Sequence, residues 1–135
     1  MCGIGGALSL SSNPIPDLAR RVSAMNDLQR HRGPDGQGLW EHPNGKVGLG
    51  HRRLSIIDLE TGDQPMTDGN GNWITYNGEL YNYIELRDDL DPGAFVTTSD
   101  TEVILRAYRR WGPACLDSFR GMFSFALWDE AANTL

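Results

Sequence analysis

The stretch CGIGGALSL, residues 2–10, predicts the first element of the fold, a β-strand that the turn-forming sequence SSNPIP at residues 11–16 ends. Three of the four residues from 3 to 6 are glycines, although glycine carries an entropic cost. Cys2 has two interpretations. It is either a small apolar residue at the start of an edge strand or, once Met1 is removed, an N-terminal residue that carries a thiol and a free α-amine on one carbon.

Two longer helices are predicted further along the chain. The first runs from Asp17 to about Arg30, and the second begins behind Ser99 and ends at Gly112-Pro113. Ser99 and Glu102 have the spacing of a capping box, in which the two residues satisfy each other's backbone N–H groups. The apolar residues at helical spacing are Leu18, Val22, Met25 and Leu28 in the first helix, and Val103, Ile104, Ala107, Tyr108 and Trp111 in the second.

The remaining segments alternate between short strands and a short helix. The strands are predicted at residues 38–42, 46–58, 73–79, 94–97 and 121–129, and the helix at 81–90. This order indicates an α+β fold in which each sheet needs cover on at least one face. The last strand, GMFSFALWD, is apolar on both sides, so we expect it to be buried. Because a long apolar strand is an aggregation hazard at a sheet edge, we expect residues 1–135 to be a fragment of a longer protein.

Composition excludes several classes of function. A length of 135 residues and a hydrophobic fraction of 39% suit one folded domain. The net charge of −6 argues against a nucleic-acid partner or an anionic membrane surface. No apolar run approaches the ~18 residues of a membrane span. Because Cys2 and Cys115 are the two cysteines, we expect a reduced, cytoplasmic protein, with Cys115 as a buried structural thiol.

No metal site is predicted. Residues 68–79, DGNGNWITYNGE, have oxygen-bearing side chains at positions one, three, five and twelve of a calcium loop. Position six is Trp73 rather than the glycine that makes the sharp turn of such a loop. His31, His42 and His51 lack the spacing of zinc ligands.

Four segments carry polar residues where a plain fold would not need them: HRGPDGQG (31–38), GHRRLSIIDLETGDQPM (50–66), YNGELYN (76–82) and TSDTEVI (97–103). Each also has an ordinary interpretation. Asn77-Gly78 is a strong turn dipeptide. Asp100 suits the first turn of a helix, where the helix dipole favours a carboxylate. Arg53 could form a surface ion pair of little energetic value.

Taken with MCGI at residues 1–4 and FRGMFSFALWD at 119–129, these segments occur in the order typical of class II glutamine amidotransferases. Over residues 1–135 the chain most resembles the N-terminal glutaminase domain of bacterial glutamine-hydrolysing asparagine synthetases. The resemblance implies a fold of the N-terminal-nucleophile hydrolase type, an α+β four-layer αββα sandwich. We expect that sandwich to be incomplete at its C-terminal end.

The resemblance also implies the chemistry. Met1 is removed, and Cys2 becomes the nucleophile that forms a thioester with the side-chain carbonyl of L-glutamine. A free thiol has a pKa near 8.5 and an α-amine has one near 7.7–8.0. Because these two pKa values are close, the amine can accept the thiol proton through a water molecule. The amine then returns that proton to the departing ammonia. We hypothesise that the glycines behind Cys2 let the strand approach the substrate closely.

Further site residues follow from the same resemblance. The side-chain amide of Asn77 and the backbone N–H of Gly78 are expected to form the oxyanion hole. Arg53 is expected to bind the α-carboxylate of glutamine and Asp100 its α-ammonium group. Glu79 and the backbone at Leu54 and Ile56 are expected to line the pocket.

The expected partners are L-glutamine and a C-terminal synthetase domain, with a homodimer also compatible with the resemblance. No cofactor is expected for the glutaminase step, whereas ATP and magnesium are implied for the synthetase domain. Other interpretations stay open. The chain could serve a related amidotransferase that acts on another acceptor, or be a non-catalytic domain that binds glutamine or docks a partner. A papain-like enzyme with His31 or His51 as its base is a more distant alternative.

Overall fold

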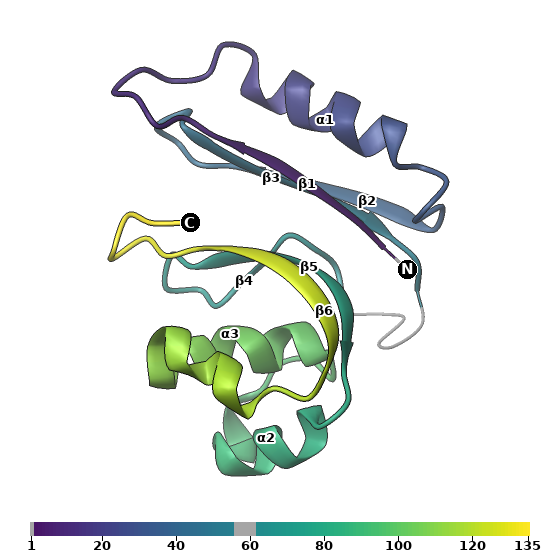
Figure 1. The fold of residues 1–135 in the computed structure, drawn as a ribbon, viewed down its shortest axis with the longest axis vertical. Helices are drawn as coiled ribbons and strands as arrows, with labels where there is room; N and C mark the ends of the chain where they lie inside the picture. The colour runs from purple at the N-terminus through teal and green to yellow at the C-terminus, as the bar shows by residue number, and fades with distance from the viewer. Residues whose placement is uncertain (1, 56–61) are drawn as a thin grey trace.

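The structure, a computed structural model, describes residues 2–55 and 62–135. It confirms the α+β class: two antiparallel sheets face each other, and helices cover their outer faces (Figure 1). The elements are β1 (Gly3–Leu8), α1 (Leu18–Leu28), β2 (Gly36–Glu41), β3 (Val47–Arg53), β4 (Met66–Thr67), β5 (Trp73–Leu80), α2 (Tyr83–Asp89), η1 (Pro92–Ala94), α3 (Asp100–Trp111), η2 (Gly112–Ser118) and β6 (Gly121–Trp128).

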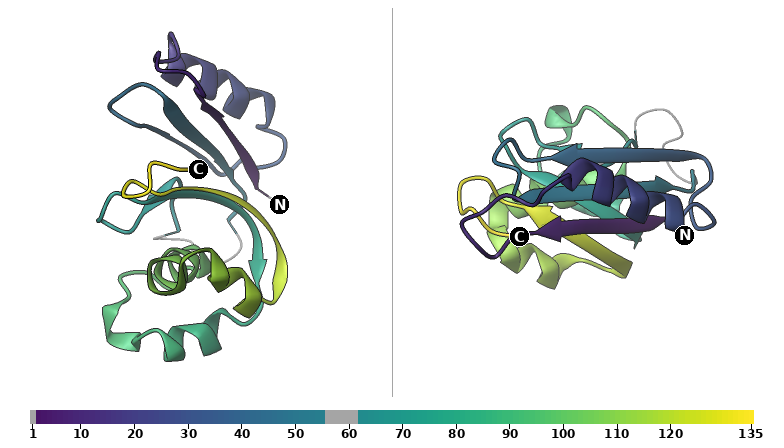
Figure 2. Two further views of the ribbon diagram at one scale, coloured as in Figure 1. Left: turned by 60° about the vertical axis from the view of Figure 1, so that its left-hand side comes forward. Right: turned by 90° about the horizontal axis from the view of Figure 1, so that it is seen from above.

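The first sheet has the strand order β1-β3-β2. Gly3 pairs with Arg52, so the start of β1 lies beside the end of β3. Helix α1 lies across the outer face of this sheet (Figure 2). Two glycines of β1 lie tight against the side chain of Gln29, the C-cap residue of this helix: a Cβ on Gly3 would lie 2.8 Å from its Oε1, and one on Gly5 would lie 3.2 Å from its Nε2. The structure therefore gives these two glycines a packing role beside the end of α1, and the hypothesis that they let the strand approach the substrate closely stays a prediction.

The second sheet has the order β4-β5-β6, and α3 packs against it. The predicted apolar face of α3 is confirmed, since Val103, Ile104 and Ala107 are all fully buried. Cys115 is 1% exposed, as expected of a structural thiol, and burial raises the pKa of this thiol. The buried residues of this core are Met66, Ile74, Tyr76, Leu80, Leu86, Val103, Ile104, Leu105 and Leu127.

The expectation that the last strand is buried on both faces holds only at its C-terminal end, where Leu127 and Trp128 are both buried. In the part of the chain that the structure describes, β6 is an edge strand that pairs with β5 alone. Phe123, Phe125 and Leu127 pack on or within the core, whereas Met122, on the other face, is 68% exposed. Alternation along the strand sends one set of side chains to the core, whereas the other set is exposed at Met122 and Ser124 but buried at Trp128.

The segment from residue 94 to 97 is not the predicted strand. Residue 94 ends the short 3₁₀-helix η1, and beyond it the carboxylate of Glu102 accepts hydrogen bonds from the backbone N–H groups of Val96 and Thr97. These N–H groups therefore hold a loop in place and do not pair with a neighbouring strand. Ser99 caps α3 as predicted, accepting from Thr101 N at 3.1 Å, but Glu102 bonds to this loop rather than closing a capping box.

The strand predicted for residues 46–58 is shorter in the structure. β3 ends at Arg53, and the backbone N–H of Ser55 is taken by the Asp35 carboxylate at 2.8 Å. Residues 56–58 lie outside the described residues.

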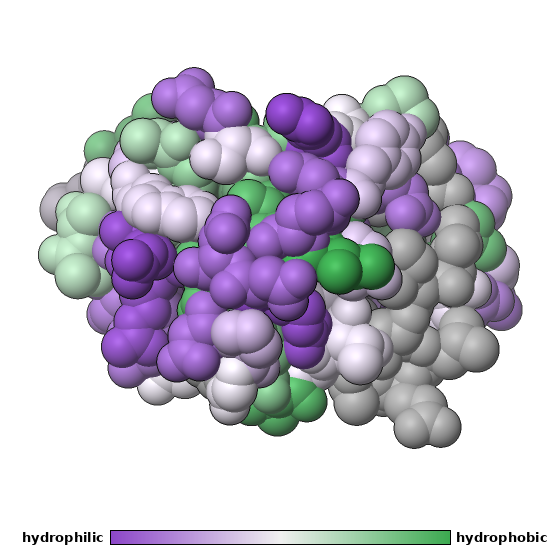
Figure 3. All heavy atoms as spheres, turned by 90° about the horizontal axis from the view of Figure 1, so that it is seen from below, coloured by the Kyte–Doolittle hydropathy of each residue, from purple (hydrophilic) through white to green (hydrophobic). Residues whose placement is uncertain are grey.

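Two hydrogen bonds join the facing sheets near their centre. Thr75 Oγ1 donates to the carbonyl of Gly50 at 3.0 Å, and His51 Nε2 lies 3.1 Å from the carbonyl oxygen of Tyr76. Away from these bonds the rings of Trp40 and Trp73 stack with centroids 5.0 Å apart. The face on which α2 lies is mostly hydrophilic, with a few scattered apolar side chains (Figure 3). In the described part of the chain, no helix has the length and apolar character needed to cross a membrane.

Candidate active site

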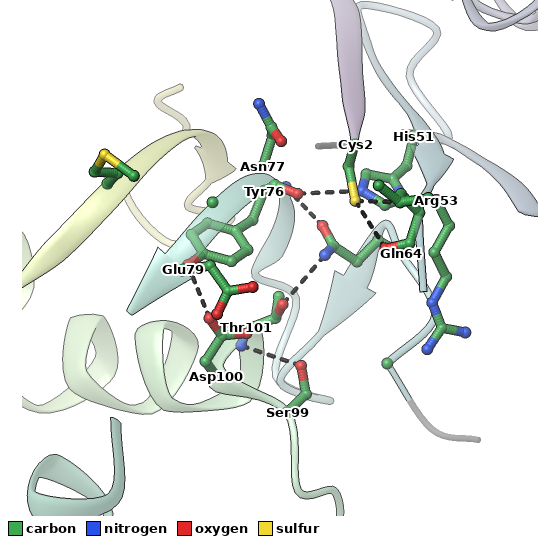
Figure 4. A pocket seen from close by; sticks show the side chains of 14 residues that line it. Cys2, His51, Arg53, Gln64, Tyr76, Asn77, Glu79, Ser99, Asp100 and Thr101 are labelled. Carbon is green, nitrogen blue, oxygen red and sulfur yellow. Dashed lines mark hydrogen bonds between the residues drawn. The ribbon is translucent and has the colours of Figure 1, made fainter. Parts of the chain in front are cut away.

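A cavity of about 170 Å³ opens where the N-terminus, the end of β3, strand β5 and the start of α3 meet. These four segments are far apart in the sequence, yet residues from all of them line one space (Figure 4). The register of the first sheet explains one side of the cavity, because it places the beginning of β1 next to the end of β3. The other side is built by β5 and the α3 start that packs behind it.

Cys2 stands at the mouth of this cavity, immediately before β1. Its Sγ accepts a hydrogen bond from the backbone N–H of Leu54 at 3.3 Å and lies 3.6 Å from the Leu54 carbonyl oxygen. Arg32 Nε donates to the Cys2 carbonyl at 3.3 Å. The thiol is a free cysteine of intermediate burial, so it is both held in place and open to the cavity.

Arg53 supplies a positive charge to the same cavity. Its guanidinium forms an ion pair with Asp63, with Nη1 2.8 Å from Oδ1. The Arg53 side chain is 12% exposed, whereas that of Asp63 is 89% exposed. The well-solvated carboxylate of Asp63 screens this ion pair, so a ligand carboxylate can compete with Asp63 for the guanidinium.

Asn77 and Gly78 lie together on β5 beside the cavity, with the Asn77 side chain on the opposite face of the strand from the Tyr76 ring (Figure 4). The Oδ1 atom of Asn77 is buried and has no hydrogen-bond partner among the described residues. Gly78 lies tight against β6, because a Cβ added to it would lie 2.6 Å from the Cα of Phe123. β5 therefore approaches β6 closely at the point where the two residues face the cavity.

Negative charge gathers at the other end of the cavity. Asp100 is 6% exposed at the start of α3, and its Oδ2 accepts from Tyr76 Oη at 2.8 Å and from the Leu80 N–H at 3.1 Å. Glu79 lies nearby, and burial, reinforced by the charge of Asp100, raises the pKa of Glu79 above its usual range. The cavity thus has a cationic side at Arg53 and an anionic side at Asp100 and Glu79.

Gln64 and His51 also line the cavity and both lie in the quoted segment 50–66, but Gln64 was not predicted as a site residue and His51 was considered only as the base of a papain-like enzyme. Gln64 Oε1 accepts from the Tyr76 N–H at 2.6 Å, and Gln64 Nε2 donates to Thr101 Oγ1 at 3.2 Å. His51 is 1% exposed and bonds to Tyr76 across the gap between the sheets. Burial, together with the charge of Arg53, lowers the pKa of His51 to about 4.

Most of the expected site residues come together in space. Cys2, Arg53, Leu54, Asn77, Gly78, Glu79 and Asp100 all line this one cavity. Ile56 lies outside the described residues. Of the histidines considered as a base, His31 is exposed, and the hydrogen bond of His51 goes to a carbonyl oxygen rather than to the thiol.

Comparison with known proteins identifies the family of this chain. Residues 1–135 match the family model of the glutamine amidotransferase domain. Over its whole length the chain is 40% identical to asparagine synthetase [glutamine-hydrolyzing] 1 of Bacillus subtilis, and it covers 22% of that protein. It is also 40% identical over 98% of its length to asparagine synthetase [glutamine-hydrolyzing] 2 of the same bacterium, of which it covers 18%. A third relative, amidase chry2 of Gibberella zeae, is 40% identical over the whole chain, which covers 22% of it.

The chain therefore belongs to the glutamine amidotransferase domain family. It is homologous to the glutaminase half of glutamine-hydrolysing asparagine synthetases. It spans about a fifth of the length of these relatives.

Proposed function

We propose that this domain hydrolyses the side-chain amide of L-glutamine to glutamate and ammonia, with Cys2 as the nucleophile. The observation that carries the proposal is the convergence of a thiol, an asparagine–glycine pair and two opposite charges on one cavity. A glutamine molecule presents the matching groups: an amide carbon, a carbonyl oxygen that becomes an oxyanion, a carboxylate and an ammonium.

The reaction begins with attack of Cys2 Sγ on the side-chain amide carbon of glutamine. After removal of Met1 the α-amine of Cys2 accepts the thiol proton through a water molecule. The carbon–sulfur bond forms and the carbonyl π electrons move onto oxygen, giving a tetrahedral intermediate. When the carbonyl reforms, the carbon–nitrogen bond breaks, and the protonated amine delivers its proton to the leaving ammonia. Water then hydrolyses the glutamyl thioester to glutamate and the free thiol.

Asn77 and Gly78 are proposed to stabilise the oxyanion of that intermediate, through the Asn77 side-chain amide and the Gly78 backbone N–H. Such donors act mainly in the transition state, where the charge on oxygen develops. The burial of Asn77 Oδ1 without a partner among the described residues supports an orientation in which the NH₂ end of this amide is the end available to a ligand.

Charge is proposed to select glutamine over other amides. Arg53 would bind the α-carboxylate through two N–H groups, releasing the exposed Asp63. Asp100 would bind the α-ammonium group with the help of Glu79, and both carboxylates lie on the side of the cavity away from Arg53. The backbone of Leu54 holds the thiol, and we propose a lining role for Ile56 from the family resemblance alone.

The ammonia is proposed to feed ATP-dependent asparagine synthesis in a C-terminal synthetase domain, as the printed names of the relatives suggest. ATP and Mg²⁺ belong to that further domain, because this chain has no SGG-type ATP loop. We propose an N-terminal-nucleophile hydrolase architecture for residues 1–135, a cytoplasmic location, and a homodimer as a compatible assembly. Similarity to amidase chry2 favours a second candidate, an amidotransferase with another acceptor.

An intact-mass measurement followed by labelling tests the glutaminase proposal. The protein that carries this chain is incubated with a diazo-ketone analogue of glutamine, with and without excess glutamine. We expect a mass that lacks one methionine and a single adduct on Cys2 that glutamine prevents. Cys2→Ala should give no adduct and release no ammonia while still binding glutamine. Retained Met1, or ammonia release by Cys2→Ala at the wild-type rate, would overturn the mechanism, and the first result would leave a non-catalytic domain.

A further inference from the structure

We propose that His51 is a positioning residue that holds the strand carrying Asn77 and Gly78 at a fixed distance from Cys2. This role deepens the proposed function and rests on it. His51 lies on β3, in the sheet that begins at Cys2, and Tyr76 lies on β5, in the sheet that carries Asn77. The His51–Tyr76 hydrogen bond therefore connects the nucleophile's sheet to the oxyanion strand (Figure 4).

The contact is buried and reinforced. His51 is 1% exposed, and its Nε2 lies 3.1 Å from the Tyr76 carbonyl oxygen. The residues immediately before these two make a second contact in the opposite direction. Thr75 Oγ1, on β5, donates to the Gly50 carbonyl, on β3, at 3.0 Å. Adjacent residues of β3 and β5 thus form a pair of hydrogen bonds across the gap between the sheets. Because hydrogen bonds shielded from water are strong and directional, this pair fixes the separation of the two sheets beside the cavity.

The bonded carbonyl is next to the proposed oxyanion donors. The Tyr76 carbonyl belongs to the peptide group that joins Tyr76 to Asn77, and the next peptide group supplies the Gly78 N–H. Gln64 Oε1 accepts from the Tyr76 N–H at 2.6 Å, so the peptide groups on both sides of Tyr76 are held by side chains. A displacement of about 1 Å at a reacting centre can cost on the order of 10²-fold in rate. Holding this backbone in place therefore affects kcat much more than it affects the binding of substrate in the ground state.

The same geometry argues against a direct chemical role for His51. A carbonyl oxygen can only accept, so the proton of the imidazole lies on Nε2 and is used in the bond to Tyr76. The hydrogen-bond contacts that the structure gives to the Cys2 thiol are with the backbone of Leu54. Burial keeps the imidazole neutral at physiological pH, since the pKa of His51 is lowered to about 4. His51 thus acts through the backbone of Tyr76.

Side-chain length provides a sharp test. Glutamine can place an amide N–H near the position of histidine Nε2, whereas asparagine is too short and leucine has no donor. In the protein that carries this chain, we expect His51→Asn and His51→Leu to lower kcat by about 10- to 100-fold, somewhat less than loss of an oxyanion donor. KM should change less than about threefold, because the affected contacts form in the transition state. His51→Gln should recover most of kcat.

Two further measurements separate positioning from other roles. The rate at which iodoacetamide alkylates Cys2 should be the same in all His51 variants, because the thiol keeps its Leu54 contacts. Labelling by the diazo-ketone glutamine analogue should slow in parallel with kcat. His42 provides a matched control, since its partly buried imidazole bonds to Glu130 at 3.0 Å outside this cavity. His42→Gln and His42→Leu should keep the wild-type kcat.

Specific outcomes would overturn the proposal. Equal loss of kcat in His51→Gln and His51→Asn, with slower iodoacetamide alkylation in both, would make His51 a base for Cys2. Unchanged kcat in folded His51→Asn would show that the contact has no role in the reaction. If His51→Leu does not fold, the comparison of the glutamine and asparagine variants decides alone. A wild-type protein that releases no ammonia would instead overturn the proposed function.

Discussion

The phenol oxygen of Tyr76 lies 2.8 Å from Oδ2 of Asp100 and donates a hydrogen bond to it. The Leu80 N–H donates to the same oxygen at 3.1 Å, so two positions of β5 hold the first carboxylate of α3. Burial, followed by the charge and hydrogen bond of Asp100, raises the pKa of Tyr76 above its ordinary value. The phenol therefore stays protonated as a donor, and the sheet orients the anionic end of the cavity.

Tyr76→Phe should loosen this carboxylate without touching the nucleophile. We expect KM for glutamine to rise about five- to tenfold and kcat to stay within about threefold, because a binding contact common to ground and transition states is weakened. Loss of a hydrogen bond to a charged group should also lower the free energy of unfolding by about 1–3 kcal/mol. Steady-state kinetics and urea denaturation measure both effects. Tyr81→Phe is the control, since Tyr81 is 61% exposed. A fall in kcat alone would contradict this role.

Asn77→Ala should have the opposite kinetic signature. Removing one oxyanion donor typically lowers kcat by ~10²–10³, and KM should change little because the donor acts on charge that develops later. Ser124→Ala on β6 is the matched control, because Ser124 pairs with Asn77 across the strands. Ammonia release at saturating glutamine measures the effect. Wild-type kcat in a folded Asn77→Ala protein would remove this residue from the oxyanion hole.

Arg53→Lys should weaken recognition of the α-carboxylate, since lysine keeps the charge but not the planar pair of donors. We expect KM to rise about 10- to 100-fold, as loss of charged hydrogen bonds predicts. The preference for glutamine over 4-aminobutanamide, which lacks the α-carboxylate, should fall in parallel. Arg20→Lys controls for the substitution, because the Arg20 side chain is 79% exposed in its ion pair with Asp17. An unchanged preference would place the α-carboxylate elsewhere.

Glu102→Gln tests the loop that replaces the predicted strand. Burial acts to raise the pKa of Glu102, but hydrogen bonds from Thr97, Val96 and Arg106 outweigh it and leave this pKa below its usual value. A lowered carboxyl pKa stabilises the fold above the unfolded-state pKa of about 4.3 and loses that effect as pH falls further.

Wild type should therefore be more stable than Glu102→Gln by about 1–3 kcal/mol at pH 7, and the difference should shrink on acidification through pH 4. Urea denaturation at several pH values measures this difference. Glu85→Gln on the exposed face of α2 should show no such pH-dependent gap. A difference that does not change with pH would contradict the assignment of the effect to the ionised carboxylate.

The lowered pKa of His51 predicts a further pH dependence of stability. Between its ordinary value of 6.5 and about 4, the unfolded chain binds a proton that the folded protein excludes. Stability therefore falls as pH drops through this window, by up to about 3 kcal/mol at 1.36 kcal/mol per pKa unit. His51→Gln should lack this contribution, so wild type should lose more stability than the variant between pH 7 and pH 4. Parallel losses in the two proteins would show that His51 does not resist protonation.

Some of the site could be predicted from the sequence and some could not. Cys2, Arg53, Asn77 and Asp100 lie in short motifs, and each motif carries the residue type that its proposed chemistry needs. His51 lies two positions from Arg53, but its role could not be inferred because its partner is a backbone carbonyl 25 residues away. A contact to backbone leaves no complementary side chain for sequence reasoning to find.

The sequence by itself determined the two longer helices and the family, because local periodicity and ordered motifs are properties of the chain. The apolar face predicted for the first helix is buried at Leu18 and Val22 but not at Leu28, which is 79% exposed.

Only the tertiary structure decided that residues 95–97 form a loop, since the Glu102 carboxylate takes the N–H groups of Val96 and Thr97 that a strand would have used. It also decided how the cavity is assembled. Cys2 immediately precedes β1 of the first sheet, whereas Asn77 and Gly78 lie on β5 of the second. The two sheets are joined by hydrogen bonds across the gap between them, which no local pattern encodes.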